Sequence, residues 1–379
     1  MLKILSAHGL FSLSRAFIGA VLVVYLMDRG IDLSVVAIAK SAQLVASVIF
    51  NYPAGLLADK YGNKLAILLA CCAELIYFSL ILHPSNSTVI AGEIFNGIGI
   101  ALYTGAYEAW IFTQKNNKED SFSLISRSAE MLFIATILSG LLGAIFSQYS
   151  ILLSITFMGI SFVAYTFTPE KKKSKTKNTE ETTSSGLLKL LRTANYNVVN
   201  YVVFGGLMQL IYQFWPVFFK SFPLSYSQTK IGFVFAASMA AQWFFTYYAR
   251  RKNFNKYPYA PIICYSGIIL TSLITIIAPS YLFNFNTIII ALYCLFISVC
   301  AFTVNYFFSR SCNIYSDSPD ESSMISLLDT SARCFGAAAL AIVSLFNVQD
   351  VALIWSIFPL FTMIIAITAL SKRTLYHVS

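Results

Sequence analysis

The segment Asn51–Ile67, NYPAGLLADKYGNKLAI, separates two strongly apolar runs of the sequence. It contains a proline, two glycines, an aspartate and two lysines. A short connection between two helices needs glycine, because glycine adopts backbone conformations that other residues avoid. Small residues such as Gly55 also allow helices to approach closely inside a membrane. We therefore expect a tight helix–turn–helix connection, with Asp59, Lys60 and Lys64 at a membrane surface.

The rest of the chain is as apolar as the runs beside this segment. Of its 379 residues, 57% are hydrophobic and 11% are charged, whereas a soluble domain carries about 25% charged residues. A globule of this size cannot bury so much apolar surface, so we expect lipid around most of the chain. The net charge of +9 lies in short basic segments between apolar runs, which is typical of membrane topology. We expect no nucleic-acid partner.

Twelve stretches of the sequence approach the length of about 20 apolar residues that a helix needs to cross a bilayer. They cover residues 4–27, 33–58, 64–83, 87–114, 120–147, 150–168, 194–221, 227–249, 257–279, 284–311, 319–346 and 350–371. Nineteen lysines and arginines lie between or at the ends of these spans on the side of the N-terminus, and three lie on the other side. Because basic loops stay in the cytoplasm, we expect both termini there.

The longest polar stretch, Thr168–Gly186, is rich in lysine, serine, threonine and glutamate and divides the spans six and six. We predict an all-α membrane protein with a six-helix half at 1–168, a cytoplasmic linker at 169–193 and a second six-helix half at 194–379. The seven cysteines lie mostly inside apolar runs and show no metal-site or disulfide spacing. We expect neither a metal ion nor a cofactor.

Two segments resemble the major facilitator superfamily of transporters. Gly55–Lys64, GLLADKYGNK, is similar to the signature between the second and third helices of that family, with Asn63 in place of the usual arginine. Gly105–Trp110, GAYEAW, at the end of the fourth span, resembles a segment of the drug/proton antiporter branch. The branch usually has an aspartate a few residues later, where this chain has Thr113 and Gln114.

The resemblance implies a role for the signature in the transport cycle. Its conformational residues are Gly55, Asp59, Lys60, Gly62 and Lys64. In the family, the aspartate docks at the start of helix 11 when the cytoplasmic side is closed, and here that start is predicted at Ser318–Glu321. The acidic residues already present there would repel Asp59. The alternative is that Asp59 and its lysines form only a solvated anchor loop.

Ionisable side chains inside the spans are costly unless paired or hydrated, so each marks a candidate site. Asp329 and Arg333 are four residues apart, and Arg127 and Glu130 are three apart, so each pair shares a helix face. Either pair is a structural ion pair or a proton-coupling site, because exposure and a nearby arginine change how readily a carboxylate binds a proton. Glu130 and Asp329 are the first proton-coupling candidates, and Glu93 is the third.

By the resemblance, helices 1, 4, 7 and 10 line a substrate cavity, with helices 2, 5, 8 and 11 beside them. The candidate cavity residues are Arg15, Lys40, Asn96, Tyr103, Tyr107, Gln209, Gln213, Trp215, Asn305, Tyr306 and Arg333. Amide and aromatic side chains suit a moderately polar organic solute. The helix that carries Glu74 is peripheral in the family, so we expect this residue to bond only to a neighbouring span.

The sequence therefore predicts a monomeric secondary transporter of the bacterial inner membrane. It would use alternating access and proton coupling to export a small organic molecule, with membrane lipid, protons and the solute as its partners. The alternative is proton-coupled import of an anionic nutrient or of a metal chelate such as a siderophore, which Arg15, Lys40 and Arg333 would suit. We find no nucleophile–base pair for an enzyme. A membrane receptor or a lipid scramblase remains open.

Overall fold

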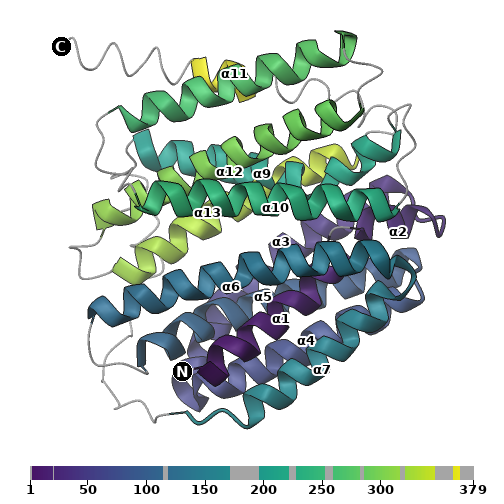
Figure 1. The fold of residues 1–379 in the computed structure, drawn as a ribbon. Helices are drawn as coiled ribbons and strands as arrows, with labels where there is room; N and C mark the ends of the chain where they lie inside the picture. The colour runs from purple at the N-terminus through teal and green to yellow at the C-terminus, as the bar shows by residue number, and fades with distance from the viewer. Residues whose placement is uncertain are drawn as a thin grey trace. The chain divides into compact units, whose positions relative to one another are not determined.

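The computed structural model describes residues 2–19, 21–113, 118–170, 196–221, 228–251, 259–281, 286–315, 321–345 and 362–367. All regular elements in these ranges are helices (Figure 1). The chain forms two compact units. The first unit contains Met1–Thr182, Ser227–Ala236 and Ala337–Leu345, and the second contains Thr183–Tyr226, Ala237–Gly336 and Phe346–Ser379.

The described helices follow the predicted spans closely. They are α1 (Leu2–Gly19), α2 (Leu22–Met27), α3 (Leu33–Tyr61), α4 (Asn63–Leu82), α5 (Asn86–Thr113), α6 (Lys118–Ile145), the short 3-10 helix η1 (Ser147–Tyr149), α7 (Ser150–Thr166), α9 (Tyr196–Ser221), α10 (Gln228–Arg251), α11 (Ala260–Tyr281), α12 (Asn286–Tyr315) and α13 (Glu321–Val343). By length and apolar composition, three stretches of the described helices qualify to cross a membrane: Leu33–Asn51, Asn63–Leu82 and Ala291–Phe308.

Three predictions about the helices need correction or fall outside the described residues. The first predicted span, 4–27, is interrupted after Gly19, where the N–H of Val21 donates to the carbonyl oxygen of Ile18. Most of the predicted twelfth span, 350–371, lies outside the described residues, although 362–367 are helical. Nearly all of the predicted linker, 169–193, lies outside them as well, so the predicted limits of the two halves stay a prediction.

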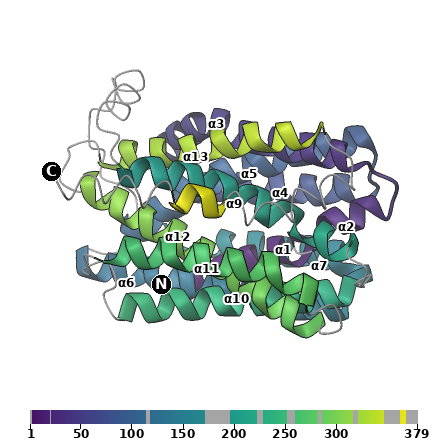
Figure 2. The same cartoon turned by 90° about the horizontal axis from the view of Figure 1, so that it is seen from above.

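Within the first unit, α5 lies between α3 and α4, while α1 packs on α6 and α7 (Figures 1 and 2). Gly97 of α5 makes the approach to α3 possible, because a Cβ atom there would overlap the backbone carbonyl of Gln43. One turn away from this close crossing, Lys40 of α3 and Glu93 of α5 come into contact. The packing of α3 and α5 therefore builds the site described below.

The turn between α3 and α4 is a single residue, Gly62, with φ of 102°. This confirms the tight glycine turn that the sequence predicts. Glu170, which follows α7, caps the start of α4: its Oε1 atom accepts hydrogen bonds from the backbone N–H of Asn63 at 2.7 Å and of Lys64 at 3.3 Å. A Cβ atom on Gly62 would lie 3.0 Å from Glu170 Oε2, so the turn has a second reason for glycine.

Gly55, the other glycine of the signature, was expected to allow the close approach of a neighbouring helix. Gly55 is exposed, and a Cβ atom there would meet no described atom within 4 Å. The expected close helix approach at Gly55 is therefore wrong for the part of the chain that the structure describes. The side chain of Asp59 and the predicted helix start at Ser318 lie outside the described residues, so their docking stays a prediction.

In the second unit, α12 packs against both α9 and α11. An aromatic cluster fills this junction: the ring of Phe307 is 5.4 Å from that of Tyr265 and stacks on Phe204 at 6.4 Å, measured between ring centroids. All three side chains are fully buried. This apolar packing holds α9 and α12 beside each other, with a small cavity between their polar side chains and those of α13.

Candidate functional site

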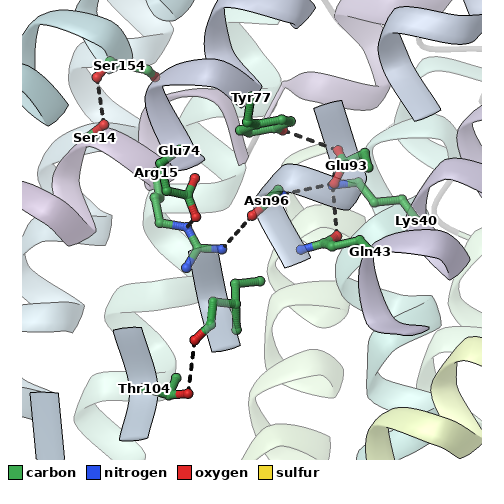
Figure 3. A network of polar contacts seen from close by, with 11 residues as sticks. Ser14, Arg15, Lys40, Gln43, Glu74, Tyr77, Glu93, Asn96, Thr104 and Ser154 are labelled. Atoms are coloured by element: carbon green, nitrogen blue, oxygen red, sulfur yellow. Dashed lines mark hydrogen bonds and ion pairs between the residues drawn. The ribbon is translucent and has the colours of Figure 1, made fainter. Parts of the chain in front are cut away.

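Four charged side chains from four helices meet inside the first unit (Figure 3). Lys40 Nζ of α3 lies 2.7 Å from Glu93 Oε1 of α5, and Arg15 Nε of α1 lies 3.2 Å from Glu74 Oε1 of α4. The Lys40, Glu74 and Glu93 side chains are 6%, 0% and 1% exposed, whereas that of Arg15 is 31% exposed. Buried charges at this depth require partners, because each is expensive to remove from water.

Neutral side chains join the two ion pairs. Asn96 Oδ1 accepts a hydrogen bond from Arg15 Nη2 at 3.1 Å, and Asn96 Nδ2 donates to Glu93 Oε2 at 2.9 Å. Tyr77 donates its hydroxyl to Glu93 Oε1 at 3.2 Å. Lys40 also donates to Gln43 Oε1 at 3.4 Å. We call these seven residues the buried charge network: Arg15, Lys40, Gln43, Glu74, Tyr77, Glu93 and Asn96.

The network has two positive and two negative charges, so it is neutral as a whole. Glu93 has a donor on each oxygen, with Lys40 and Tyr77 on Oε1 and Asn96 on Oε2. Glu74 has only the ionic contact with Arg15, and neither of its oxygens accepts a hydrogen bond from the described residues. The two carboxylates therefore have unequal support for their negative charge.

The sequence predicted members of this network without predicting their pairing. Arg15, Lys40 and Asn96 were cavity candidates, and Glu93 was a proton-coupling candidate. The bond from Glu74 to a neighbouring span was expected, and its partner is Arg15 of α1. Nothing in the sequence indicated the pairing of Lys40 with Glu93, because it depends on how the helices pack.

The first unit contains a second chain of buried polar side chains. His8 Nδ1 and the Tyr103 hydroxyl are 2.7 Å apart, and the Tyr103 and Tyr165 hydroxyls are also 2.7 Å apart. The His8 ring stacks on Tyr107 with a centroid distance of 4.2 Å, and the Tyr107 hydroxyl lies 2.9 Å from Ser128 Oγ. The predicted cavity residues Tyr103 and Tyr107 are thus buried and bonded within the unit. His8 and Tyr165 were missed by the sequence analysis.

The second unit contains a cavity of about 150 Å³ between α9, α12 and α13. Its lining consists of Tyr201, Gly205, Met208, Gln209, Tyr212, Ala301, Val304, Asn305, Asp329, Ala332 and Arg333. It combines one ion pair with two amides and two phenols. Such a lining can donate hydrogen bonds to, and accept them from, the hydroxyl, amide and carbonyl groups of a solute. Its apolar part can contact the carbon atoms of the solute.

The predicted pairing of Asp329 with Arg333 is confirmed. Arg333 Nη2 lies 2.7 Å from Asp329 Oδ2, and Tyr201 donates its hydroxyl to Asp329 Oδ1 at 3.4 Å. The Tyr212 hydroxyl donates to Gln242 Oε1 at 2.9 Å. The Asp329 side chain is 37% exposed and that of Arg333 is 19% exposed, so the pair is accessible from the cavity.

Only some of the cavity residues predicted in the second half line this cavity. Gln209, Asn305 and Arg333 line the second-unit cavity, whereas Gln213, Trp215 and Tyr306 do not. Tyr306 is buried and accepts a hydrogen bond from Arg310 Nε at 3.2 Å. Tyr201 was missed by the sequence analysis, because a tyrosine is common in this chain and carries no distinguishing pattern.

The proton-coupling candidate Glu130 lies on α6 and is half-buried, but it is not a member of the buried charge network. The side chain of Arg127, its expected partner, lies outside the described residues. That pairing therefore stays a prediction. The described residues contain no group of three or more histidine, cysteine, aspartate or glutamate side chains that could hold a metal ion.

Comparisons with known proteins identify the family of the chain. The sequence matches the family model described as Major Facilitator Superfamily over residues 4–341. No curated protein sequence matches it significantly. Among solved structures, it is similar to the nucleoside transporter NupG, at 15% identity and a TM-score of 0.73, over 98% of each chain.

Two further solved structures show the same likeness. A D-xylose–proton symporter is 12% identical, with a TM-score of 0.72 over 97% of this chain and 96% of that chain. An auto-inhibited POT family peptide transporter is 13% identical, with a TM-score of 0.69 over 98% of this chain and 96% of that chain. These likenesses establish the fold, and with the family match they confirm the predicted all-α membrane protein of two halves. The chain belongs to the Major Facilitator Superfamily and is an integral membrane transporter, not an enzyme.

Proposed function

We propose that the protein is a proton-coupled secondary transporter that exports a small polar organic solute by alternating access. The observation that carries this proposal is the second-unit cavity, in which the Asp329–Arg333 ion pair lies beside Gln209, Asn305 and Tyr201. The neutral groups suit recognition of a polar solute. The accessible carboxylate suits proton coupling, because its affinity for a proton changes with exposure and with the position of its arginine.

The size and charge of the cavity favour a small, uncharged or zwitterionic solute. Its volume of about 150 Å³ is below the roughly 300–1,000 Å³ that is usual for pockets that hold drug-sized ligands. The ion pair adds no net charge to the lining. The similar structures include a D-xylose–proton symporter and a nucleoside transporter, which supports a polar solute and the proton as coupling ion.

Import of an anionic nutrient or a metal chelate such as a siderophore is the second candidate. It was favoured by the three cations Arg15, Lys40 and Arg333. Each of them has a carboxylate partner, namely Glu74, Glu93 and Asp329 respectively. Their positive charge is therefore already balanced, and this argues against an anionic solute.

The direction and the topology are part of the proposal. Export is supported by the resemblance of Gly55–Lys64 and Gly105–Trp110 to the antiporter branch. The distribution of lysine and arginine supports a bacterial inner-membrane protein with both termini in the cytoplasm, and we propose that it acts as a monomer. A cysteine-reactive probe that cannot cross membranes should not label a cysteine placed in 169–193 of intact cells. Labelling there would overturn the topology.

A ligand screen followed by flux measurements tests the function. Purified protein is screened for thermal stabilisation by D-xylose, uridine, a neutral dipeptide, citrate and an iron–siderophore complex. We expect stabilisation by one of the uncharged or zwitterionic solutes, and a matched loss of this stabilisation in Gln209→Ala and Asn305→Ala. Stabilisation by citrate or the chelate alone would favour the second candidate instead.

A further inference from the structure

The buried charge network holds two carboxylates that differ in one decisive way. Glu93 is supported by Lys40, Tyr77 and Asn96, which together place a donor on each of its oxygens. Glu74 is completely buried, and neither of its oxygens accepts a hydrogen bond from the described residues. Its contact with Arg15 Nε at 3.2 Å is ionic without the alignment of a hydrogen bond. The negative charge of Glu74 therefore depends on Arg15.

Among the described residues, Arg15 is the only cation in direct contact with Glu74. The charged groups near it are Arg15 from α1, Lys40 from α3 and Glu93 from α5, and Lys40 is already bound to Glu93. Helix α7, which also packs on α4, has no charged residue in Ser150–Thr166. On its own helix, Tyr77 donates its hydroxyl to Glu93 instead.

The backbone of α5 leaves a fitted space for this carboxyl group. A Cβ atom at Gly99 would lie 3.0 Å from Glu74 Oε1 and 3.3 Å from its carboxyl carbon. Any larger residue would press on the carboxyl group. The space holds a carboxyl without any donor from α5, which suits a neutral carboxylic acid better than an unpaired anion.

Arg15 can leave this pair, whereas Glu74 cannot follow it. The Arg15 side chain is 31% exposed and already divides its donors between Glu74 and the Asn96 side chain. A movement toward water or toward a solute would leave a buried carboxylate without a cation. Such a charge is very expensive in an apolar interior, and uptake of one proton from water removes it. Return of Arg15 releases the same proton to water.

We propose that Glu74 is the proton-binding carboxylate of the first unit, and that Arg15 controls its occupancy. This inference rests on the proposed proton-coupled function. Within the network, it makes Glu74 the proton-coupling residue in place of Glu93, which the sequence analysis had named. Arg15 is the member of the network that responds to water or a solute arriving from outside it. Lys40 and Glu93 form a permanent structural pair.

Infrared difference spectroscopy of the purified protein tests this inference with the proton as the only ligand. A pH titration in H₂O and D₂O detects the C=O stretching band of a protonated carboxyl group in an apolar environment. We expect the wild-type protein to show such a band and Glu74→Gln to lose it completely. The double variant Arg15→Gln/Glu74→Gln leaves no unpaired cation, so it serves if the single variant misfolds. It should lose the band as well.

The matched control is Lys40→Gln/Glu93→Gln, which removes the other ion pair without changing the net charge. It should keep the band. Persistence of the band in Glu74→Gln, its loss in the matched control, or its absence from the folded wild-type protein would each overturn the inference. The test uses no solute, so it can fail while solute flux still follows a proton gradient. Equally, flux that ignores a proton gradient would refute the proposed function without changing the spectrum.

Discussion

Lys40 Nζ lies 2.7 Å from Glu93 Oε1, and both side chains are almost completely buried in the first unit. Removal of one partner leaves an uncompensated charge, which costs about 3–5 kcal/mol, whereas removal of both leaves none. Glu93→Gln should therefore lower the unfolding midpoint in detergent strongly. Lys40→Gln/Glu93→Gln should recover most of the loss. Equal midpoints for the single and double variants would show that the pair is not coupled.

Glu170 should stabilise the start of α4 in two ways, by accepting hydrogen bonds and by its negative charge. Its Oε1 atom accepts from the N–H groups of Asn63 and Lys64. Loss of a helix cap costs about 0.5–2 kcal/mol, and a negative charge at a helix N-terminus contributes about 0.3–1 kcal/mol. Glu170→Ala should therefore destabilise more than Glu170→Gln. Hydrogen exchange at the Asn63 and Lys64 amides measures both, and no faster exchange in either variant would contradict the cap.

The two glycines of the signature should respond differently to alanine. Gly62 has a positive φ, and a Cβ atom there would press on Glu170, so Gly62→Ala should destabilise the protein by about 1–2 kcal/mol. Gly55 is helical and exposed, with no described atom near its Cβ position, so Gly55→Ala should be neutral or slightly stabilising. Thermal unfolding of the two variants side by side checks this, and similar losses would contradict it.

Asp59→Asn should shift the transporter toward the conformation that is open to the cytoplasm. The resemblance implies that Asp59 meets the start of helix 11 in the closed form, where a charge at a helix terminus contributes up to about 2 kcal/mol. Distances between spin labels across the cytoplasmic face would report the shift in population. Unchanged distance distributions would leave Asp59 as part of a solvated anchor loop.

The sequence predicted those features of the fold that depend on neighbours in the chain. Apolar runs gave the helices, the glycine pattern gave the turn at Gly62, and the four-residue spacing gave the Asp329–Arg333 pair. The interruption of the first span after Gly19 was missed, because residues 16–27 are an apolar run without a charged residue or proline.

The pairings in the first unit could not be predicted in this way. Arg15 and Glu74 lie on different helices, as do Lys40 and Glu93. Their contacts depend on the rotation of each helix and on the depth at which it packs. For Lys40 and Glu93, Gly97 allows the close crossing of α3 and α5. The sequence marked these residues as candidate sites because charges inside a membrane are costly, but it could not say which charge compensates which.

Solute flux in proteoliposomes tests the central claim most directly. The solute that stabilises the purified protein is offered outside vesicles with an acidic lumen, with an acidic exterior, or with no gradient. Proton-coupled export by antiport predicts accumulation above the external concentration only when the lumen is acidic, and a protonophore should abolish it. Accumulation with an acidic exterior would reverse the proposed direction, and uptake that is the same under all three conditions would contradict proton coupling.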